Sequence, residues 1–440
     1  MTLAVARTAP GRPAVTSATS EAPAGERSAS RTAVAALTLL VLVTGFGDGI
    51  AAGLKEATGA ASPWMFLLPL LILALLVFWA RGNPLPAPRY LLEAFALLSC
   101  MMLVLTLTVF LLAKVYISGY LQLAVFAATL ILVQGVFAQA PRWLAQAFPG
   151  ALVIAHYFLC GYVAVALFSW HLAGIDPSAI RLLVPPDATN PFPPPFRPVG
   201  FSVEPAWAAL AIAASYIGIF CLVPGERLRG FLALVTAAVM LQAGTLTLFS
   251  GVFAVAYVMR NREPRVQMAL FLLLAMVVAG QLYLSWDRID SVLDGDDASL
   301  RQRASSVPVA WGVIEQSFPI GVGYGNFREF AQYGLEWRQY LNLTEATFYK
   351  SDLFPLNFTA ELGAFGAVIL LWVAWILARG PSILPVAFYG LVLVLSGTLL
   401  LPPLLVLTAV VGLLRQRREQ ASVDWTSPAE AATWGGSGRS

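Results

Sequence analysis

Long apolar stretches alternate with short polar connections over most of the chain. Apolar runs lie near 34–54, 63–80, 91–113, 117–138, 148–170, 206–223, 266–284 and 358–378. Each run approaches the about 20 residues that a helix needs to cross the hydrocarbon core of a bilayer. Because backbone polar groups find no partners in lipid, each run is expected to be helical. The pattern predicts an all-α polytopic membrane protein.

Two longer apolar stretches are predicted to be pairs of helices. Residues 230–259 lie between "PGERLRG" and "RNREPR", and residues 382–415 lie between Arg379 and "RQRRE". Short basic loops stay on the cytoplasmic side, so each stretch must leave that side and return to it. We expect the first pair to meet near Gly244 to Gly251 and the second to turn at Pro402. The total is about twelve transmembrane helices with both termini cytoplasmic.

The arginines of the short loops agree with this topology. Loops assigned to the cytoplasm carry Arg81, Arg89, Arg142, Arg227, Arg229, Arg260, Arg262, Arg265 and Arg379. Short loops assigned to the outside carry only Lys55, Lys114, Arg181 and Arg197. The bias has the sign that the positive-inside rule requires.

Three regions follow from the same pattern. Residues 1–32 are predicted to be a disordered cytoplasmic tail, 33–415 the polytopic membrane domain, and 416–440 a second disordered cytoplasmic tail. Two long segments of the membrane domain fall outside: a proline-rich loop at 171–205, and a large extracytoplasmic loop at 285–357 between spans 9 and 10. A large polar loop beside the bilayer favours chemistry or recognition on lipid-borne substrates.

Composition narrows the function classes. The chain of 440 residues is 58% hydrophobic and 12% charged, whereas soluble domains carry about 25% charged residues. A net charge of +3 with scattered basic residues argues against nucleic acid as a partner. Cys100, Cys160 and Cys221 lie in apolar runs and form neither a disulfide framework nor a metal-binding spacing. We predict no metal and no cofactor.

The large outer loop contains "SFPIGVGYGNF", residues 317–327. Its glycine spacing does not fit a dinucleotide site, and the chain contains no G-x-x-x-x-G-K-[ST]. Two interpretations stay open: a plain turn, or a close approach of the backbone to a bulky ligand, which glycine permits. The second makes the loop substrate-binding, through Gly321, Gly323, Tyr324, Gly325, Asn326 and Phe327.

An arginine-bearing segment precedes these glycines. Val309, Val313 and Ile314 follow Arg301 and Arg303 at helical spacing, which predicts an amphipathic helix lying on the membrane surface. The arginines either meet solvent and lipid head groups or grip a phosphate as bidentate donors. In the second case, they and the glycines would share the non-cytosolic side and clasp one diphosphate.

Four further polar residues carry expectations. Arg197 and Glu204 lie in the outer loop "RPVGFSVEP", where Glu204 either caps the next helix or acts on a sugar hydroxyl. Glu93 lies near the end of an apolar run and is expected either to snorkel toward the interface or to pair with another helix. His156 in "VIAHYFL" is expected to form an interhelical hydrogen bond.

The order of "RPVGFSVEP", the arginine segment, "PIGVGYGNF" and "AELGAFG" resembles the O-antigen ligase and O-antigen polymerase superfamily of bacterial integral membrane glycosyltransferases. The resemblance covers residues 195 to 375 and the twelve-span layout. Glu204 followed by Pro205 makes the chain more similar to capsule and exopolysaccharide polymerases.

The resemblance implies an enzyme that polymerises undecaprenyl-pyrophosphate-linked repeat units into O-antigen, capsule or exopolysaccharide. It implies the outer face of the bacterial inner membrane as its place, with a glycan donor, a glycan acceptor, the lipid bilayer and a chain-length regulator as partners. One alternative is an O-antigen ligase or glycan-to-protein transferase with the same donor. A polysaccharide transporter or flippase is the alternative from another class.

The resemblance also implies residue roles. Arg303 and Arg301 would stabilise the pyrophosphate leaving group, with Arg197 as a second contact. Where ligases carry a histidine, this chain has Asp352. Asp352 or Glu204 would then be the general base for the acceptor hydroxyl, in an inverting, metal-independent displacement.

Overall fold

A computed structural model describes residues 24–46, 64–111, 117–174, 205–241, 243–260, 298–330, 354–395 and 402–424, with single helical positions between 267 and 279. Helices are the only secondary structure within these residues. The all-α prediction is therefore confirmed for the described part of the chain.

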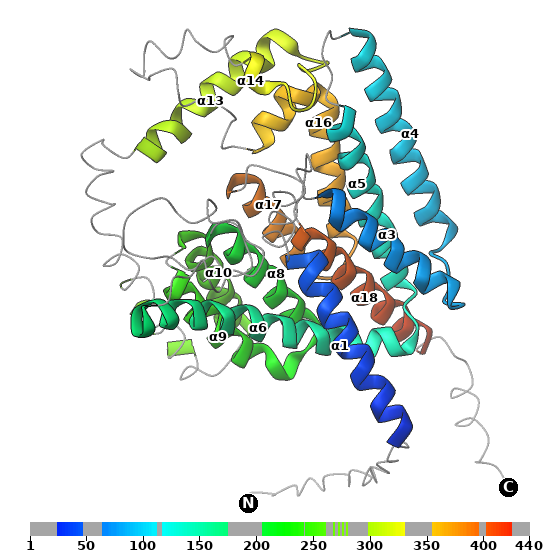
Figure 1. The fold of residues 1–440 in the computed structure, drawn as a ribbon, viewed down its shortest axis with the longest axis vertical. Helices are drawn as coiled ribbons and strands as arrows, with labels where there is room; N and C mark the ends of the chain where they lie inside the picture. Colours follow the sequence, from blue (N-terminus) through cyan, green and yellow to red (C-terminus); the bar gives the residue numbers. More distant parts are fainter. Residues whose placement is uncertain are drawn as a thin grey trace, which may run out of the picture.

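The helices are arranged as Figure 1 shows. They are α1 (Ala24–Phe46), α3 (Trp64–Ala80), α4 (Pro88–Leu111), α5 (Ile117–Ala138), α6 (Arg142–Ala173), α8 (Pro205–Leu222), α9 (Arg227–Leu241), α10 (Gly244–Arg260), α13 (Ala298–Ser317), α14 (Phe327–Phe330), α16 (Phe354–Ala378), α17 (Leu384–Leu395) and α18 (Pro402–Asp424).

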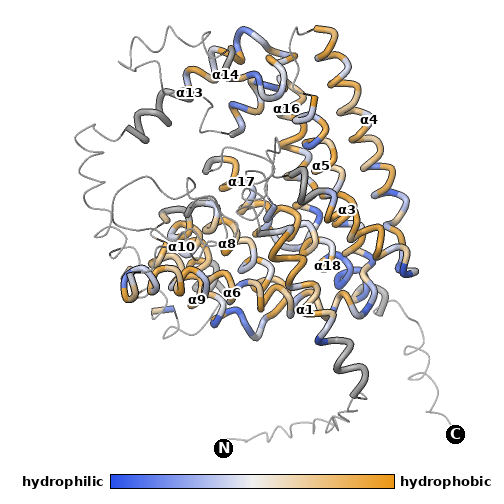
Figure 2. The backbone as a smooth tube through the Cα atoms, viewed as in Figure 1, coloured by the Kyte–Doolittle hydropathy of each residue, from blue (hydrophilic) through white to orange (hydrophobic). Residues whose placement is uncertain are grey.

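Four of these helices are long and apolar enough to cross a membrane, namely α4, α5, α6 and the Pro355–Ala378 part of α16. Shorter apolar segments lie in α1, α3, α8, α10 and α17. Apolar residues dominate α3, α4 and α5, whereas polar residues gather on the C-terminal half of α18 (Figure 2). The chain is thus a helical membrane protein. The count of twelve spans stays a prediction, because most of the apolar run at 266–284 lies outside the described residues.

Both predicted helix pairs are present. The stretch 230–259 divides into α9 and α10, and α10 begins at Gly244, where the sequence predicts the break. The stretch 382–415 divides into α17 and α18, and α18 begins at Pro402. Proline suits the first helical turn because the N–H that it lacks would have no partner there.

Three predicted boundaries are wrong. Helix α1 begins at Ala24, inside the predicted tail 1–32, and α18 continues to Asp424, inside the predicted tail 416–440. Helix α16 begins at Phe354, inside the predicted outer loop 285–357. The polar continuation of α18 contains Arg, Gln and Glu, which have good helix propensity. In α18 the polar half also has tertiary bonds, since the side chain of Gln416 donates to Ala140 O at 2.7 Å.

Helices α4 and α5 differ in their surroundings. Most residues of α5 are buried, among them Phe126, Leu130 and Ile131. Helix α4 leaves Phe95 and Phe110 70% and 83% exposed, as suits a helix facing lipid at the rim of the protein.

Two ends of the α4, α5 and α16 assembly are distinguished by their contacts. At one end, which we call the basic end, α4 begins and α5 and α16 finish; Arg379 there contacts both Glu93 and Gln134. At the other, the glycine end, α5 and α16 begin beside α13 and α14, and Tyr324 contacts Tyr120. Both ends bear on function.

Candidate functional site

The glycine loop, residues 318–326, joins α13 to α14 at the glycine end (Figure 1). Its three glycines have φ of 82° at Gly321, 92° at Gly323 and 82° at Gly325. Residues with a side chain rarely adopt positive φ, so this backbone path requires glycine.

A break in α16 receives this loop. Gly363 has φ 60° and ψ −143°, which interrupts the helix. In a regular helix the N–H of Ala364 would donate to Ala360 O. Here that N–H donates to Pro319 O at 2.9 Å, and Ala360 O accepts the N–H of Val322 at 3.0 Å. The loop thus supplies partners for the backbone groups that the break releases.

Glu361 binds the same loop twice. Its backbone carbonyl accepts the N–H of Gly323 at 2.8 Å. Its carboxylate accepts the N–H groups of Gly325 and Phe327. The side chain is 7% exposed, so this carboxylate acts as a buried clamp on the glycine loop.

The backbones meet most closely between Gly321 and Gly363. A Cβ on Gly321 would lie 2.5 Å from both Glu361 O and Gly363 N, and a Cβ on Gly363 would overlap Pro319 O. The close approach that glycine permits at Gly321 is therefore an approach to α16. The structure shows a close backbone approach, as in the second interpretation of the loop, but the partner that it shows is the backbone of α16.

Tyr324 ties the loop to α4 and α5. Its N–H donates to the hydroxyl of Tyr120 at 3.2 Å, and its ring meets those of Tyr120 and Phe358 edge-on, with centroids 5.9 and 6.2 Å apart. The Tyr120 hydroxyl also lies 3.3 Å from Thr108 Oγ1. The predicted contact of Tyr324 with a substrate stays a prediction, and its ring already has protein partners.

Asn326 and Phe327 are buried, with 5% and 3% exposure. The Asn326 side-chain amide donates to Val322 O at 3.1 Å. Phe327 packs in a cluster with α13 and α16 that comprises Val309, Ala310, Val313, Val322 and Ala360. The apolar face of α13 therefore lies on protein, and the expectation that it lies on the membrane surface is wrong for these residues. Hydrophobic periodicity shows that a helix face is buried, but not against what.

Arg301 and Arg303 lie in the N-terminal part of α13, and the glycine loop follows its C-terminus. Arg303 precedes Ser317 by fourteen residues, which is about 21 Å along a helix. The glycine loop folds back along α13, since Val322 packs with Val309 and Val313. The side chains of Arg301 and Arg303 lie outside the described part of the protein. The expectation that these arginines and the glycines clasp one diphosphate therefore stays a prediction.

The remaining predicted site residues, Arg197, Glu204 and Asp352, lie outside the described residues. Three residues of the glycine end were not predicted to belong to the site: Tyr120, Asn357 and Glu361. Glu361 carried a signal, since it belongs to "AELGAFG". Nothing local distinguishes Tyr120 from other tyrosines in apolar runs.

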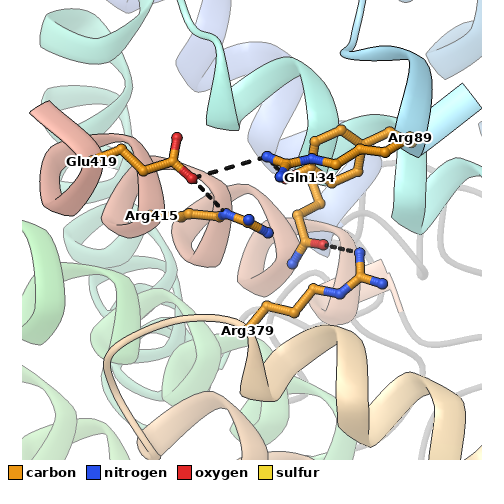
Figure 3. Close-up of polar contacts among 6 residues, drawn as sticks. Arg89, Gln134, Arg379, Arg415 and Glu419 are labelled. Atoms are coloured by element: carbon orange, nitrogen blue, oxygen red, sulfur yellow. Dashed lines mark hydrogen bonds and ion pairs between the residues drawn. The ribbon is translucent and has the colours of Figure 1, made fainter.

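The basic end is built from side chains. Arg379 Nη1 donates to Glu93 Oε2 at 2.8 Å and to Gln134 Oε1 at 3.2 Å, and its guanidinium lies 3.8 Å from the centroid of the Trp375 ring. The arrangement of Arg379 and Gln134 is drawn in Figure 3. Of the two expectations for Glu93, pairing with another helix is the one that the structure shows.

A second group at this end joins α4 to α18. Glu419 Oε1 lies 2.9 Å from Arg415 Nε and 3.9 Å from Arg89 Nη2 (Figure 3). Arg417 Nη1 donates to Leu222 O at 3.2 Å. Arg89 and Arg379, both assigned to cytoplasmic loops from the sequence, thus lie at one end of the helices.

His156 connects three helices. Its Nδ1 lies 2.9 Å from Ser215 Oγ in α8, and its Nε2 lies 3.0 Å from Gly230 O in α9. The predicted interhelical hydrogen bond is confirmed, and His156 is structural.

No group of three or more His, Cys, Asp or Glu that could hold a metal ion is found in the part of the chain that the structure describes. Searches of protein-family models, curated proteins and solved structures give no match to this chain.

Proposed function

We propose that this protein is a membrane glycosyltransferase that polymerises undecaprenyl-pyrophosphate-linked repeat units at its glycine end. One observation carries the proposal. "PIGVGYGNF" and "AELGAFG", the two motifs behind the family resemblance, form a single unit joined by the backbone bonds of Val322 and Gly323 to α16. Two sequence patterns that pack together in one structural unit are less readily explained by chance than two patterns that lie apart.

The charge distribution supports an outer-face position for the glycine end. Arginines of short loops remain in the cytoplasm, and Arg89 and Arg379 lie at the end opposite the glycine loop. The glycine end would then face the outside of the inner membrane, with both termini in the cytoplasm. Lipid-linked glycans assembled inside and exported would reach the enzyme there.

The proposed chemistry assigns binding to α13 and anchoring to the glycine loop. Arg301 and Arg303, with Arg197, would stabilise the charge that develops on the departing pyrophosphate. Asp352 or Glu204 would take the proton of the acceptor hydroxyl. The acceptor oxygen bonds to the anomeric carbon as the bond from that carbon to the pyrophosphate oxygen breaks, which inverts the centre and releases undecaprenyl pyrophosphate.

The test is deletion of the gene followed by analysis of lipid-linked glycans. Single repeat units accumulating on the carrier support a polymerase. Long polymer on the carrier would identify a ligase instead, and unchanged glycans would contradict any transferase of this kind. Complementation with Arg303→Ala should fail, whereas Arg229→Ala at the start of α9, where the side chain is 78% exposed, should restore wild-type polymer.

A further inference from the structure

Two buried asparagines lie at the glycine end, and they differ in one respect. Asn326 is 5% exposed and Asn357 is 9% exposed. The Asn326 amide donates to Val322 O at 3.1 Å. Asn357 Oδ1 is fully buried and is one of three buried side-chain polar atoms without a hydrogen-bond partner in the described part of the chain.

A buried amide oxygen without a partner costs stability, because it has given up its bonds to water. The great majority of buried polar groups are paired, and an exception in a native protein calls for an explanation. Proteins break such folding rules mainly at functional sites. The position of Asn357 shows what kind of function is involved.

Asn357 lies at a seam between two hydrophobic clusters. On α16, Leu356 and Ala360 pack with α13 and the glycine loop, whereas Phe358 and Leu362 pack in the main core of the helical assembly. A helix turns by about 100° per residue, so Asn357 faces between these two directions. Glu361, one turn further on, lies on the same face and holds the loop by Gly325 and Phe327.

We propose that Asn357 is a substrate contact, whose amide oxygen accepts a hydrogen bond from a hydroxyl of the glycan undergoing transfer. This inference rests on the proposed function, since it takes a sugar as the ligand. Sugar hydroxyls are the donors that an orphan carbonyl oxygen lacks. Rotation about the terminal side-chain torsion turns the amide toward an entering glycan without moving α16.

The experiment compares Asn357→Leu with Asn326→Leu, two changes of equal size at one junction. Each protein is purified into nanodiscs, and its melting temperature is measured without substrate. Activity is then measured with the lipid-linked repeat extracted from the deletion strain. Asn357→Leu should keep or raise the melting temperature, because it removes an unpaired group, and should lower kcat/KM about tenfold through the lost hydrogen bond. Asn326→Leu should melt at a lower temperature, because Val322 O loses its donor.

Two results would overturn the inference while leaving the proposed function intact. A fall in the melting temperature of Asn357→Leu matching that of Asn326→Leu would mean that Asn357 has its partner within the fold. Unchanged kcat/KM in a stable Asn357→Leu protein would mean that no substrate touches it. If Asn357→Leu does not accumulate in membranes, Asn357→Ala, which adds no bulk, is put through both assays. Failure of the wild-type protein to extend the repeat would instead defeat the proposed function, and the sugar contact with it.

Discussion

The basic end and the glycine end of the same helices are held together by different means. At the basic end, long side chains reach across gaps, as Arg379 does to Glu93 and Gln134. At the glycine end, two backbones touch, with Gly321 against Gly363 and peptide groups exchanged between loop and helix. Flexible side chains tolerate adjustment, but a backbone contact depends on the absence of a single Cβ.

The two kinds of contact also suit different roles. Charged side chains fix the orientation of the helices through their preference for one side of the membrane. A backbone contact instead fixes the position of α13 on α16 closely, as suits an element expected to present binding groups to a substrate. We therefore expect variants at the basic end to affect stability in proportion to burial, and variants at the glycine end to affect geometry.

The largest effect is expected from Gly321→Val. The new Cβ would lie 2.5 Å from Glu361 O, and valine strongly disfavours the φ of 82° found at Gly321. Strain and overpacking together should destabilise the folded protein by about 3 kcal/mol or more. The shift is measured by thermal unfolding of the purified protein in detergent.

Gly390→Ala provides the control for Gly321→Val. Gly390 lies in α17, and a methyl group added there would have no heavy atom within 4 Å beyond its own helix and chain neighbours, so alanine should be neutral or slightly stabilising. Equal melting temperatures for the two variants would contradict the backbone contact at the glycine end.

An intermediate effect is expected from Arg379→Ala. This change leaves Glu93 without its cation, and the Arg379 and Glu93 side chains are 10% and 31% exposed. Because Glu93 retains access to solvent, the loss should be about 1–2 kcal/mol, less than for a fully buried pair. The double variant Arg379→Gln with Glu93→Gln should lose less than the two single variants added together.

Arg229→Ala is the control for the ion pair at Arg379. Arg229 Nη1 lies 3.5 Å from Glu226 Oε1, and the Arg229 side chain is 78% exposed. We expect no measurable change in melting temperature, since exposed pairs contribute little. A fall in stability as large as that of Arg379→Ala would mean that burial does not decide how much each of these two ion pairs contributes.

Among the variants expected to destabilise the protein, Glu361→Gln should have the smallest effect. An amide oxygen can still accept from Gly325 or Phe327, but the amide NH₂ group cannot accept from the other, at a cost of about 1 kcal/mol. Hydrogen exchange of these two amides should accelerate while exchange in α5 stays unchanged. If both amides of the Glu361→Gln protein exchange as slowly as in the wild-type protein, the carboxyl group of Glu361 does not hold the loop.

The sequence anticipated the helices better than their boundaries. The splitting of 230–259 and 382–415 followed from flanking arginines. Helix α10 begins at Gly244, at one edge of the range Gly244 to Gly251 predicted for the break, and α18 begins at Pro402, where the turn was predicted. The ends of α1 and α18 did not follow, because hydropathy records only where the environment of a helix changes. Polar residues beyond that point stay helical when they find tertiary partners, as Gln416 does at Ala140 O.

The candidate site shows the same division more sharply. Several features could be predicted, because each depends on residue type within a short window. They are the glycine motif, the amphipathic character of α13, and the roles of His156 and Glu93 as interhelical partners. The packing of the loop back onto α13, where Val322 meets Val309 and Val313, could not be predicted, because it depends on the path that the chain takes after Ser317.

By itself, the sequence determined that this is a helical membrane protein with its arginines biased to one side, because solvent preference is a property of each residue. Only the tertiary structure decided what the glycines of the loop approach and which buried asparagine lacks a partner. Those facts depend on α16, some forty residues further along the chain, and the break at Gly363 that receives the loop is a backbone conformation that glycine permits but does not dictate.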